Sequence, residues 1–289
     1  MLPRPGSKTR SQLWRVSDGN WLQRDDLLAT EEPMEIRLLA GSERKTLSIT
    51  MRTPGKDFEL AAGFLYTEGI IPDRHAIARI SYCRDSDLTE DSRYNIVHVE
   101  LSSDRLPELQ SLERSTFTSS ACGVCGKAGL EALERRDLTP LPPGPEIAQE
   151  IILGLAAELR TRQGIFEATG GLHAAALFDT KGALIAIRED VGRHNAVDKL
   201  IGWAVLEGQL PWKERIVLVS GRAGYEIIQK LIVAGAPVVC AISAPSSLAV
   251  DLARAFNVTL VGFLRGERFN VYHGRERIRA AERLALSAT

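Results

Sequence analysis

The spacing of apolar and polar residues divides the chain into two parts with different patterns. In the first part, residues 31–52 alternate in the manner of two strands around a turn, and "YNIVHVEL" indicates another strand. Between them, "TPGKDFELAAGFLYTEGIIPD" has its apolar residues on one face of a helix, with Asp57 as N-cap and Gly69 at its end. These elements predict an α+β arrangement.

The second part has the pattern of a parallel sheet. "EIAQEIILGLAAELRTRQ" predicts an amphipathic helix, "HAAALFDTKGALIAIRED" a hairpin, and "HNAVDKLIGWAVLEG" a helix closed by Gly208. Strands and helices then alternate through "ERIVLVSG", "AGYEIIQKLIVAG", "APVVCAIS", "SSLAVDLARAFN" and "VTLVGFL". Buried apolar strands joined by helices favour right-handed crossovers in one sheet.

The chain is therefore expected to be an α/β protein with two domains. We expect a flexible tail over 1–24 and a smaller α+β domain over 25–140 that includes a Cys122/Cys125 loop. The proline-dense stretch between 140 and 145 is the best candidate for a linker, and a larger C-terminal domain follows over 146–289.

Composition narrows the class of protein. Of 289 residues, 44% are apolar and 25% charged, which is typical of a soluble globular chain. A net charge of −1 argues against nucleic-acid binding. The longest apolar run, "LIVAGAPVVCAISA", is shorter than the ~20 residues that cross a bilayer, and the N-terminus lacks the apolar core of a secretory signal. Four cysteines make no disulfide scaffold in a chain this long, so we expect a cytoplasmic protein with free thiols.

Cys122 and Cys125 form the "CGVC" pair of "STFTSSACGVCGKAGLEAL". A structural zinc site usually needs a second pair, but Cys83 and Cys240 stand alone, and Cys240 in "PVVCAIS" is expected in the core. A thioredoxin-like redox pair normally follows a strand, whereas "TFTSSA" is polar.

A sulfur-carrying nucleophile is a third reading of the pair. The predicted helix N-terminus and Lys127 would favour the thiolate, and the surrounding glycines would let the loop reach two partners. A flexible loop without chemistry is a fourth reading. The spacing alone does not choose among the four.

Two regions of the second part are candidate binding sites. One is a cluster of pairable polar side chains at a strand-to-helix junction, beside the ambiguous His173: Arg188, Glu189, Asp190, Arg193, His194, Asn195, Asp198 and Lys199. Their density favours a site, although a solvated helix start would explain some of them.

The other region consists of the turns "SGRAGYE", "SAPSSLA" and "FLRGERFN", which follow sheet strands, where α/β folds bind ligands. Ser246 and Ser247 suit a phosphate at a helix N-terminus, and Arg222, Arg265 and Arg268 suit phosphate oxygens. The turns match neither the P-loop nor the G-x-G-x-x-G fingerprint. Ordinary capping and surface arginines are the alternative.

Taken together, the chain resembles the FdhD family, accessory sulfurtransferases required for active formate dehydrogenases. The matching segments keep the family's order between residues 52 and 272: "RTPGKDFELAAGFLYTEGII", "SACGVCGK", "GGLHAAALF", "EDVGRHNAVDKLIG", "SGRAGYEIIQK", "APSSLAVDLA" and "LVGFLRGERFNVY". The long central segments are highly specific, whereas the cysteine pair alone is not.

The resemblance implies an enzyme, a sulfurtransferase. A cysteine desulfurase would hand sulfur to Cys122 as a persulfide, with Cys125 as its partner. The sulfur would become a ligand of molybdenum or tungsten in the bis-(molybdopterin guanine dinucleotide) cofactor, a bound substrate, before its insertion into formate dehydrogenase. No tightly bound metal of the protein's own is implied. The alternative is a non-catalytic chaperone that binds and delivers this cofactor.

The resemblance also implies which residues lie at the cofactor. The matching segment is Phe263, Leu264, Arg265, Gly266, Glu267 and Arg268, and its expected neighbours are Ser220, Gly221, Arg222, Ser246, Ser247, His194 and Asn195.

The family further implies a homodimer and a C-terminal domain with the three-layer α/β/α fold of cytidine deaminases. A deaminase needs H-x-E and P-C-x-x-C on its zinc helices, but the candidate histidines here give "HAA" and "HNA" and Cys240 is isolated. The sequence therefore argues against deamination.

Overall fold

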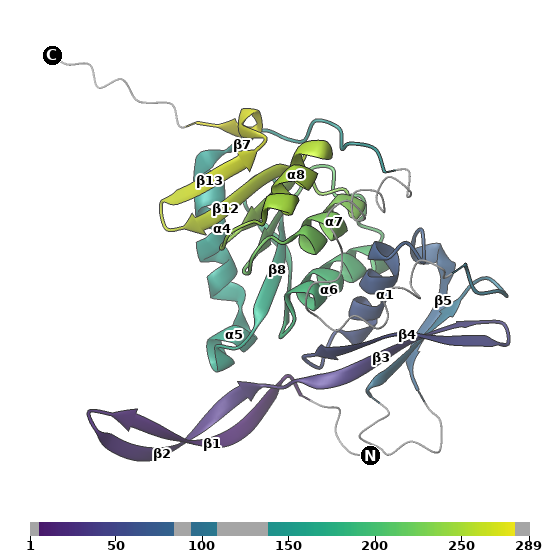
Figure 1. Ribbon diagram of the computed structural model, residues 1–289, viewed down its shortest axis with the longest axis horizontal. Coiled ribbons are helices and arrows are strands. Elements are labelled where there is room, and N and C mark those ends of the chain that lie inside the picture. The colour runs from purple at the N-terminus through teal and green to yellow at the C-terminus, as the bar shows by residue number, and fades with distance from the viewer. Residues whose placement is uncertain (1–5, 84–93, 109–137, 281–289) are drawn as a thin grey trace. The chain divides into compact units, whose positions relative to one another are not determined.

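The computed structural model describes residues 6–83, 94–108 and 138–280 (Figure 1). Its residues group into two compact units, each built from segments far apart in the sequence. The first comprises Met1–Arg136, Gln163–Ala175 and Arg188–Leu210, and the second comprises Asp137–Arg162, Ala176–Ile187 and Pro211–Thr289. The mixed α/β fold is confirmed. The boundary expected near residue 145 is wrong, because two later segments belong to the first unit.

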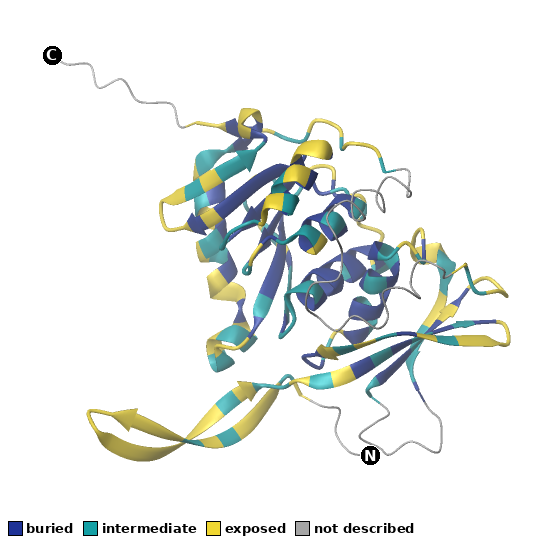
Figure 2. Cartoon of the chain, viewed as in Figure 1, coloured by how far each residue is buried: buried dark blue, intermediate teal, exposed yellow. Residues whose placement is uncertain are grey.

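Residues 8–24 are not the flexible tail that the sequence led us to expect. They form most of a hairpin in which β1 (Lys8–Ser17) pairs antiparallel with β2 (Asn20–Ala29). Asp18 and Gly19 make the turn with φ of 53° and 77°, the left-handed geometry that two-residue hairpin turns require. Most of the hairpin is exposed (Figure 2). Its sequence therefore lacks the alternation of apolar and polar residues that predicts a half-buried strand.

A four-stranded sheet forms the centre of the first unit. Its strands are β3 (Glu32–Ala40), β4 (Glu43–Arg52), β5 (Ile77–Tyr82) and β6 (Ile96–Leu101), in the order β4-β3-β6-β5. Met34, Ile36 and Leu38 alternate toward the core, so the predicted strands are confirmed.

Helix α1 (Asp57–Thr67) ends before Gly69, as predicted, but Asp57 is not its N-cap. Lys56 takes the cap position, while the Asp57 carboxylate accepts from Tyr82 Oη at 2.9 Å and pairs with the fully buried Arg52, whose Nε lies 3.2 Å from Oδ1. A buried guanidinium needs such a partner, and this requirement outweighs capping here.

Helix α6 (Arg193–Leu206) packs against α1 and completes the core of the first unit. The predicted helix is confirmed, with Gly208 at φ 64° after its end. Two short helices belong to this unit as well, α5 (Gly164–Thr169) beside β2 and the 3₁₀ turn η1 (Arg74–Ala76).

A six-stranded sheet in the order β13-β12-β11-β10-β8-β9 forms the core of the second unit and extends beyond it at β8 and β9. Its strands are β8 (His173–Phe178), β9 (Leu184–Asp190), β10 (Ile216–Val219), β11 (Val238–Ala241), β12 (Thr259–Arg265) and β13 (Arg268–His273). The predicted parallel pairing of β10, β11 and β12 is confirmed.

The helices of this unit are α4 (Gln149–Arg162), α7 (Tyr225–Val233) and α8 (Ser247–Ala255). Helices α7 and α8 are the crossovers between the parallel strands and pack together. Helix α4 packs against β12, and Figure 1 shows it on the other side of the sheet.

The proline-rich stretch is part of the second unit rather than a free linker. Leu141 N donates to Phe256 O at 3.1 Å, and Leu141 O accepts from Asn257 Nδ2 at 2.9 Å. Just after it, β7 (Ile147–Ala148) pairs in parallel with β14 (Ile278–Arg279), which follows the 3₁₀ turn η2 (Arg275–Arg277).

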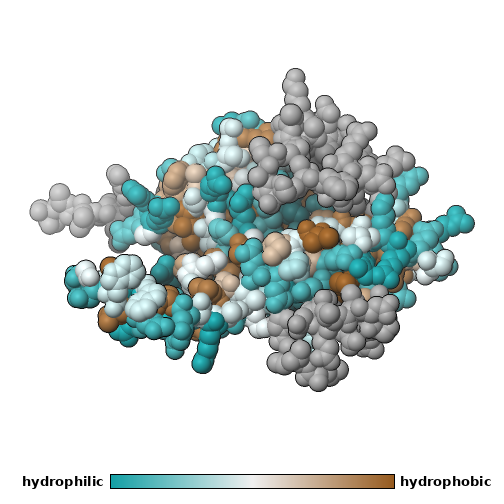
Figure 3. Space-filling view, turned by 60° about the horizontal axis from the view of Figure 1, so that its bottom comes forward, coloured by the Kyte–Doolittle hydropathy of each residue, from teal (hydrophilic) through white to brown (hydrophobic). Residues whose placement is uncertain are grey.

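On the face that Figure 3 presents, hydrophobic residues lie as separate spots among hydrophilic ones. Within the described residues, no helix is both long enough and apolar enough to cross a membrane.

Candidate functional site

The three turns predicted to bind a ligand lie side by side at the carboxyl ends of β10, β11 and β12. The first two are joined by a bridge between Ala223 and Pro245, because Ala223 N donates to Ala244 O at 3.2 Å and Ser246 N to Ala223 O at 3.1 Å. The third is tied to the second by Phe263 N, which donates to Ser243 O at 3.1 Å. The expected gathering of the turns at the sheet edge is present.

Phe263 occupies a strained position in the third turn. Its φ is 53°, in the left-handed region that a bulky residue rarely adopts, and the register of β12 against β13 shifts between Gly262 and Arg265. The side chain is 39% exposed although the residues on either side of it are buried. Strain of this kind persists where the surrounding structure imposes it, which often happens at a binding site.

Gly262 permits the close approach of the second and third turns. A Cβ at this position would lie 2.9 Å from Pro245 Cδ and 3.3 Å from Ser243 O. Any larger residue would push the two turns apart, so this glycine is required by packing rather than by its own backbone angles.

The electrostatics of these turns favour an anion. Helix α7 begins after Gly224, and α8 begins after Ser246, whose hydroxyl accepts from Ala249 N at 3.3 Å. The Ala223–Pro245 bridge brings the two helix N-termini, with their positive dipole ends, close together. The Arg222 and Arg265 side chains are exposed nearby, and Arg265 Nε is oriented by Ile242 O at 3.3 Å.

The remaining residues of the predicted segment have different environments. Leu264 is fully buried and anchors the strand in the core, so its own side chain does not reach a ligand at the surface. Gly266 has a φ of 55° in the turn that connects β12 to β13, and Glu267 and Arg268 are exposed there. Ser220 and Gly221 are half-buried and Ser247 is exposed.

The polar cluster predicted at the start of α6 is largely a buried network of the first unit. Asp190 is fully buried, and its Oδ2 lies 2.6 Å from Lys199 Nζ and accepts from Thr53 N at 3.1 Å. Its Oδ1 accepts from Gly192 N at 2.8 Å and from Asn195 Nδ2 at 3.0 Å. One carboxylate therefore connects β9, α6 and the loop before α1.

Asn195 has a structural role in this network. Its amide nitrogen also donates to Met51 O at 2.8 Å, and its Oδ1 accepts from Thr50 Oγ1 at 3.3 Å. Both ends of the buried amide are thus engaged, and direct ligand contact by Asn195 stays a prediction.

Other members of the cluster are also paired. Arg188 pairs with Glu59 and lies over the ring of Trp203, while Asp198 accepts from Thr67 Oγ1 at 3.0 Å. Glu189 accepts from the backbone N–H groups of Ile165 and Phe166 at the start of α5.

His173 lies near the residues that begin α6 in the first unit. The pKa of His173 is lowered, first by burial of the ring and then by the positive charges of Arg193 and His194, while Asp190 opposes the shift. The sequence left His173 ambiguous. Burial is the main reason that its neutral form is favoured, and the charges of its neighbours act in both directions.

Cys122 and Cys125 lie outside the described residues, so their predicted roles are not tested by the structure. Cys240 is fully buried in β11, and desolvation raises its pKa to about 12, as fits the predicted core thiol. Cys83 is also buried and free. Among the described residues, no group of three or more potential metal ligands occurs.

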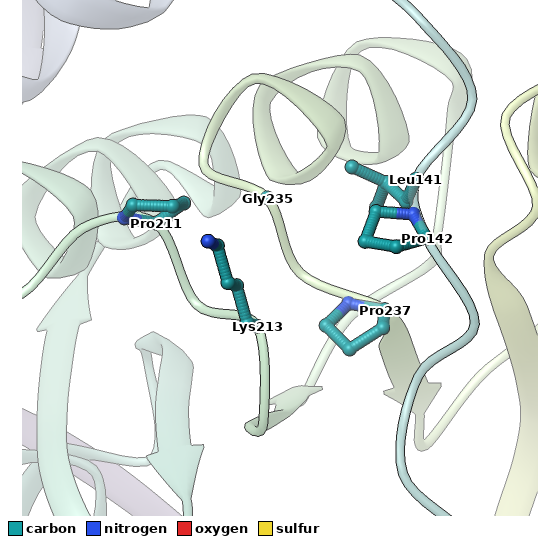
Figure 4. A pocket seen from close by; sticks show the side chains of 6 residues that line it. All are labelled: Leu141, Pro142, Pro211, Lys213, Gly235 and Pro237. Atoms are coloured by element: carbon teal, nitrogen blue, oxygen red, sulfur yellow. The ribbon is translucent and has the colours of Figure 1, made fainter.

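A shallow apolar cavity of about 120 Å³ lies elsewhere in the second unit (Figure 4). It is lined by Leu141, Pro142, Pro211, Lys213, Gly235 and Pro237. Pro237 precedes β11, so the cavity is at the amino ends of the strands and apart from the three turns.

Comparison of the chain with known proteins identifies its family. A family model described as FdhD/NarQ matches residues 29–279. The chain belongs to this family. The match covers both units, including the three turns and the polar network.

Among curated relatives of the family, the sulfur carrier protein FdhD of Streptomyces coelicolor is 48% identical over 272 residues, which cover 93% of this chain and 95% of the relative. The protein of the same description from Sulfolobus acidocaldarius is 44% identical over 264 residues, or 91% and 96% of the two chains.

A crystal structure from Desulfotalea psychrophila, described as a formate dehydrogenase accessory protein, superposes with a TM-score of 0.72 at 25% identity. The superposition covers 96% of this chain and 100% of that one. This chain and the Desulfotalea psychrophila protein therefore share one fold over nearly their full lengths.

Proposed function

We propose that this protein is a sulfurtransferase of formate dehydrogenase maturation, which carries sulfur as a persulfide on Cys122. A cysteine desulfurase persulfide would be attacked by the Cys122 thiolate, so that the sulfane sulfur moves to Cys122 and the desulfurase thiolate leaves. The transfer is redox-neutral and needs no further reactant. Its support is family membership and the relatives' description as sulfur carrier proteins.

The destination of the sulfur would be the molybdenum or tungsten bis-(molybdopterin guanine dinucleotide) cofactor, bound as substrate at the three turns. The observation that carries this part is the junction of two helix N-termini beside Arg222 and Arg265, which suits the phosphates of a dinucleotide. The exposed, strained Phe263 would offer its ring to a base. A role for His194 in binding the cofactor stays a prediction from the family resemblance.

Some of the proposed site residues would carry the sulfur, and others would bind the cofactor. Cys125 would receive or stabilise the sulfur beside Cys122, and the N–H group of Ser247, the first residue of α8 after the capping Ser246, would orient a phosphate. The cysteine desulfurase and the formate dehydrogenase would be transient partners. A cytoplasmic location agrees with the sequence and stays a prediction.

Mass spectrometry tests the carrier step. After incubation with a cysteine desulfurase and cysteine, the protein should gain the mass of one sulfur atom on the peptide that contains Cys122 and Cys125, and a reductant should remove it. A Cys122→Ala,Cys125→Ala variant is the matched control and should gain none. Equal sulfur loading of this variant would overturn the assignment.

A cofactor chaperone that never touches sulfur is the second candidate, and the same site favours it because an anion site alone suffices for delivery. Activation of formate dehydrogenase separates the two, whereas binding of GDP, a probe for half of the dinucleotide, does not. Both candidates predict GDP binding that survives loss of the cysteines, but only the chaperone predicts that formate dehydrogenase is still activated by the double variant.

A further inference from the structure

Strand β13 forms one edge of the six-stranded sheet and carries exposed polar side chains (Figure 1). Arg268 and Asn270 are two residues apart on this strand, and both are exposed. Because strand side chains alternate between faces, the two project from the same face of the sheet. Arg265 of β12 is also exposed and directly opposite Arg268, so it projects from that face as well. We call Arg265, Arg268 and Asn270 the donor row.

The donor row is on the side of the sheet where the second turn leads into α8. Asn270 is directly opposite Gly262, so a Cβ on Gly262 would mark the face from which Asn270 projects. That Cβ would lie 2.9 Å from Pro245 Cδ, in the second turn, and 3.0 Å from Tyr272 Cε2. Tyr272 is two residues after Asn270 and shares its face, which agrees with this orientation. The row therefore faces the turn that begins α8.

Arg265 and Arg268 are a like-charged pair without a compensating acid. Within the described part of the chain, neither forms an ion pair with a carboxylate, although Glu267 lies between them in the turn. Arg265 Nε donates to Ile242 O at 3.3 Å, which holds its guanidinium near the end of β11. Like charges directly opposite each other destabilise a strand pair. An anion bound between the two guanidinium groups would offset this repulsion, so the pair is suited to an anionic ligand.

Asn270 adds a neutral donor to this pair. Asparagine is depleted in strands, and among the described residues the Asn270 side chain has no hydrogen-bond partner. Gly262, directly opposite, offers it no cross-strand side chain. The amide can therefore donate its two N–H groups to the oxygens of an anion beside the arginines, without adding charge to the row.

We propose that the donor row holds the second phosphate of a nucleoside diphosphate, while the N-terminus of α8 holds the phosphate next to the ribose. The inference rests on the proposed function, because it assigns the two phosphates of a ligand bound at the three turns. The backbone N–H groups of a helix N-terminus suit one phosphate, and a pair of bidentate guanidinium groups suits another. The row thereby makes the site select a diphosphate over a monophosphate.

Calorimetric titration of the full-length protein with GDP and GMP tests the proposal. The wild type should bind GDP at least about tenfold more tightly than GMP, because only GDP has a phosphate for the donor row. Arg268→Gln should weaken GDP binding about tenfold and leave GMP binding within about twofold, so that the preference is lost. Arg254→Gln is the matched control, since it removes the same charge from an exposed site in the last turn of α8. It should keep the preference.

Substitution of Asn270 tests whether its amide donates to the same phosphate. Asn270→Asp replaces the donor by a carboxylate that repels the phosphate, and Asn270→Ala only removes the donor. The aspartate variant should therefore weaken GDP binding more than the alanine variant, and both should affect GMP less than GDP. Asn20→Asp introduces the same charge at an exposed position of β2, in the other unit, and should change neither affinity.

Thermal unfolding without nucleotide checks that the variants are folded and tests the like-charged pair. Arg268→Gln removes the repulsion and should raise the unfolding midpoint, whereas a lower midpoint would show that Arg268 has a structural role and would overturn the proposal. The proposal is also overturned if the wild type binds GMP as tightly as GDP, or if Arg268→Gln weakens both nucleotides equally. GDP binding with such an unchanged preference leaves the proposed cofactor site intact, but a complete lack of GDP binding overturns both.

Discussion

Gly63 of α1 and Gly202 of α6 face each other where the two helices cross, and neither position has room for a side chain. A Cβ on Gly63 would lie 2.8 Å from Gly202 N, and a Cβ on Gly202 would lie 2.6 Å from Gly63 N. The opposing atoms are backbone, which cannot move aside. This pair allows α6 to join the core of the first unit, although most of the sequence around α6 belongs to the second.

Substitution of Gly202 by alanine should therefore destabilise the protein. We expect the free energy of unfolding to fall by roughly 3 kcal/mol, because the added methyl group forces the helices apart. Gly154→Ala is the control, since Gly154 lies in α4 with nothing within 4 Å of a Cβ. It should raise the free energy by roughly 0.5–1 kcal/mol. Urea denaturation measures both, and equal effects would contradict the packing argument.

The buried pair of Lys199 and Asp190 should also be sensitive to substitution. Lys199→Met leaves a buried carboxylate without its cation, which should lower the free energy of unfolding by roughly 3–5 kcal/mol. Arg254→Ala removes the exposed Arg254–Asp251 pair in α8 and should cost less than about 1 kcal/mol. A loss of similar size in both variants, measured by denaturation, would show that burial of the first pair is unimportant.

His173 should make the protein less stable in mild acid. Its pKa is lowered in the folded protein, so the unfolded chain binds the proton first as the pH falls below about 6.5. The stability present above that pH should decline through this window. His173→Gln cannot take up the proton and should show a shallower decline. Denaturation at a series of pH values compares them, and parallel curves would contradict the prediction.

Phe263 should lower the stability of the protein and strengthen its binding of GDP. Phe263→Gly relieves the left-handed strain and should stabilise the protein by roughly 1 kcal/mol, while loss of the ring should weaken GDP binding about tenfold or more. Phe263→Ala keeps the strain and loses the ring, so it should weaken binding without the gain in stability. Calorimetry and thermal unfolding of both variants measure the two effects. Unchanged GDP affinity in both would exclude Phe263 from the base site.

The sequence predicted the elements whose apolar pattern is local. The strands of 31–52, the helix ending at Gly69 and the parallel strands β10, β11 and β12 all follow from periodicity. The hairpin at 8–29 was missed because its side chains are exposed on both faces, although the Asp18–Gly19 turn signal is present in the sequence.

The unit boundary and the polar network could not be obtained in this way, because both depend on contacts between distant segments. Thr53 is 137 residues from Asp190, and Gly63 is 139 residues from Gly202. From the sequence alone, Asp190 cannot be distinguished from an exposed acidic residue just before a helix, because its contact with Thr53 N depends on the fold. The cluster around Asp190 was therefore interpreted as a ligand site, whereas its buried members are paired with one another.

The central claim is that Cys122 carries the sulfur, and activation of formate dehydrogenase in vitro tests it most directly. Purified protein, cysteine desulfurase, cysteine, molybdenum cofactor and inactive enzyme would be combined with the wild type, Cys122→Ala, Cys125→Ala or Cys240→Ala. Cys240 is the control because its buried thiol, with a pKa of about 12, cannot act as a carrier. We predict that Cys122→Ala abolishes activation and Cys240→Ala preserves it, with an intermediate loss for Cys125→Ala. Full activation by Cys122→Ala would contradict the account.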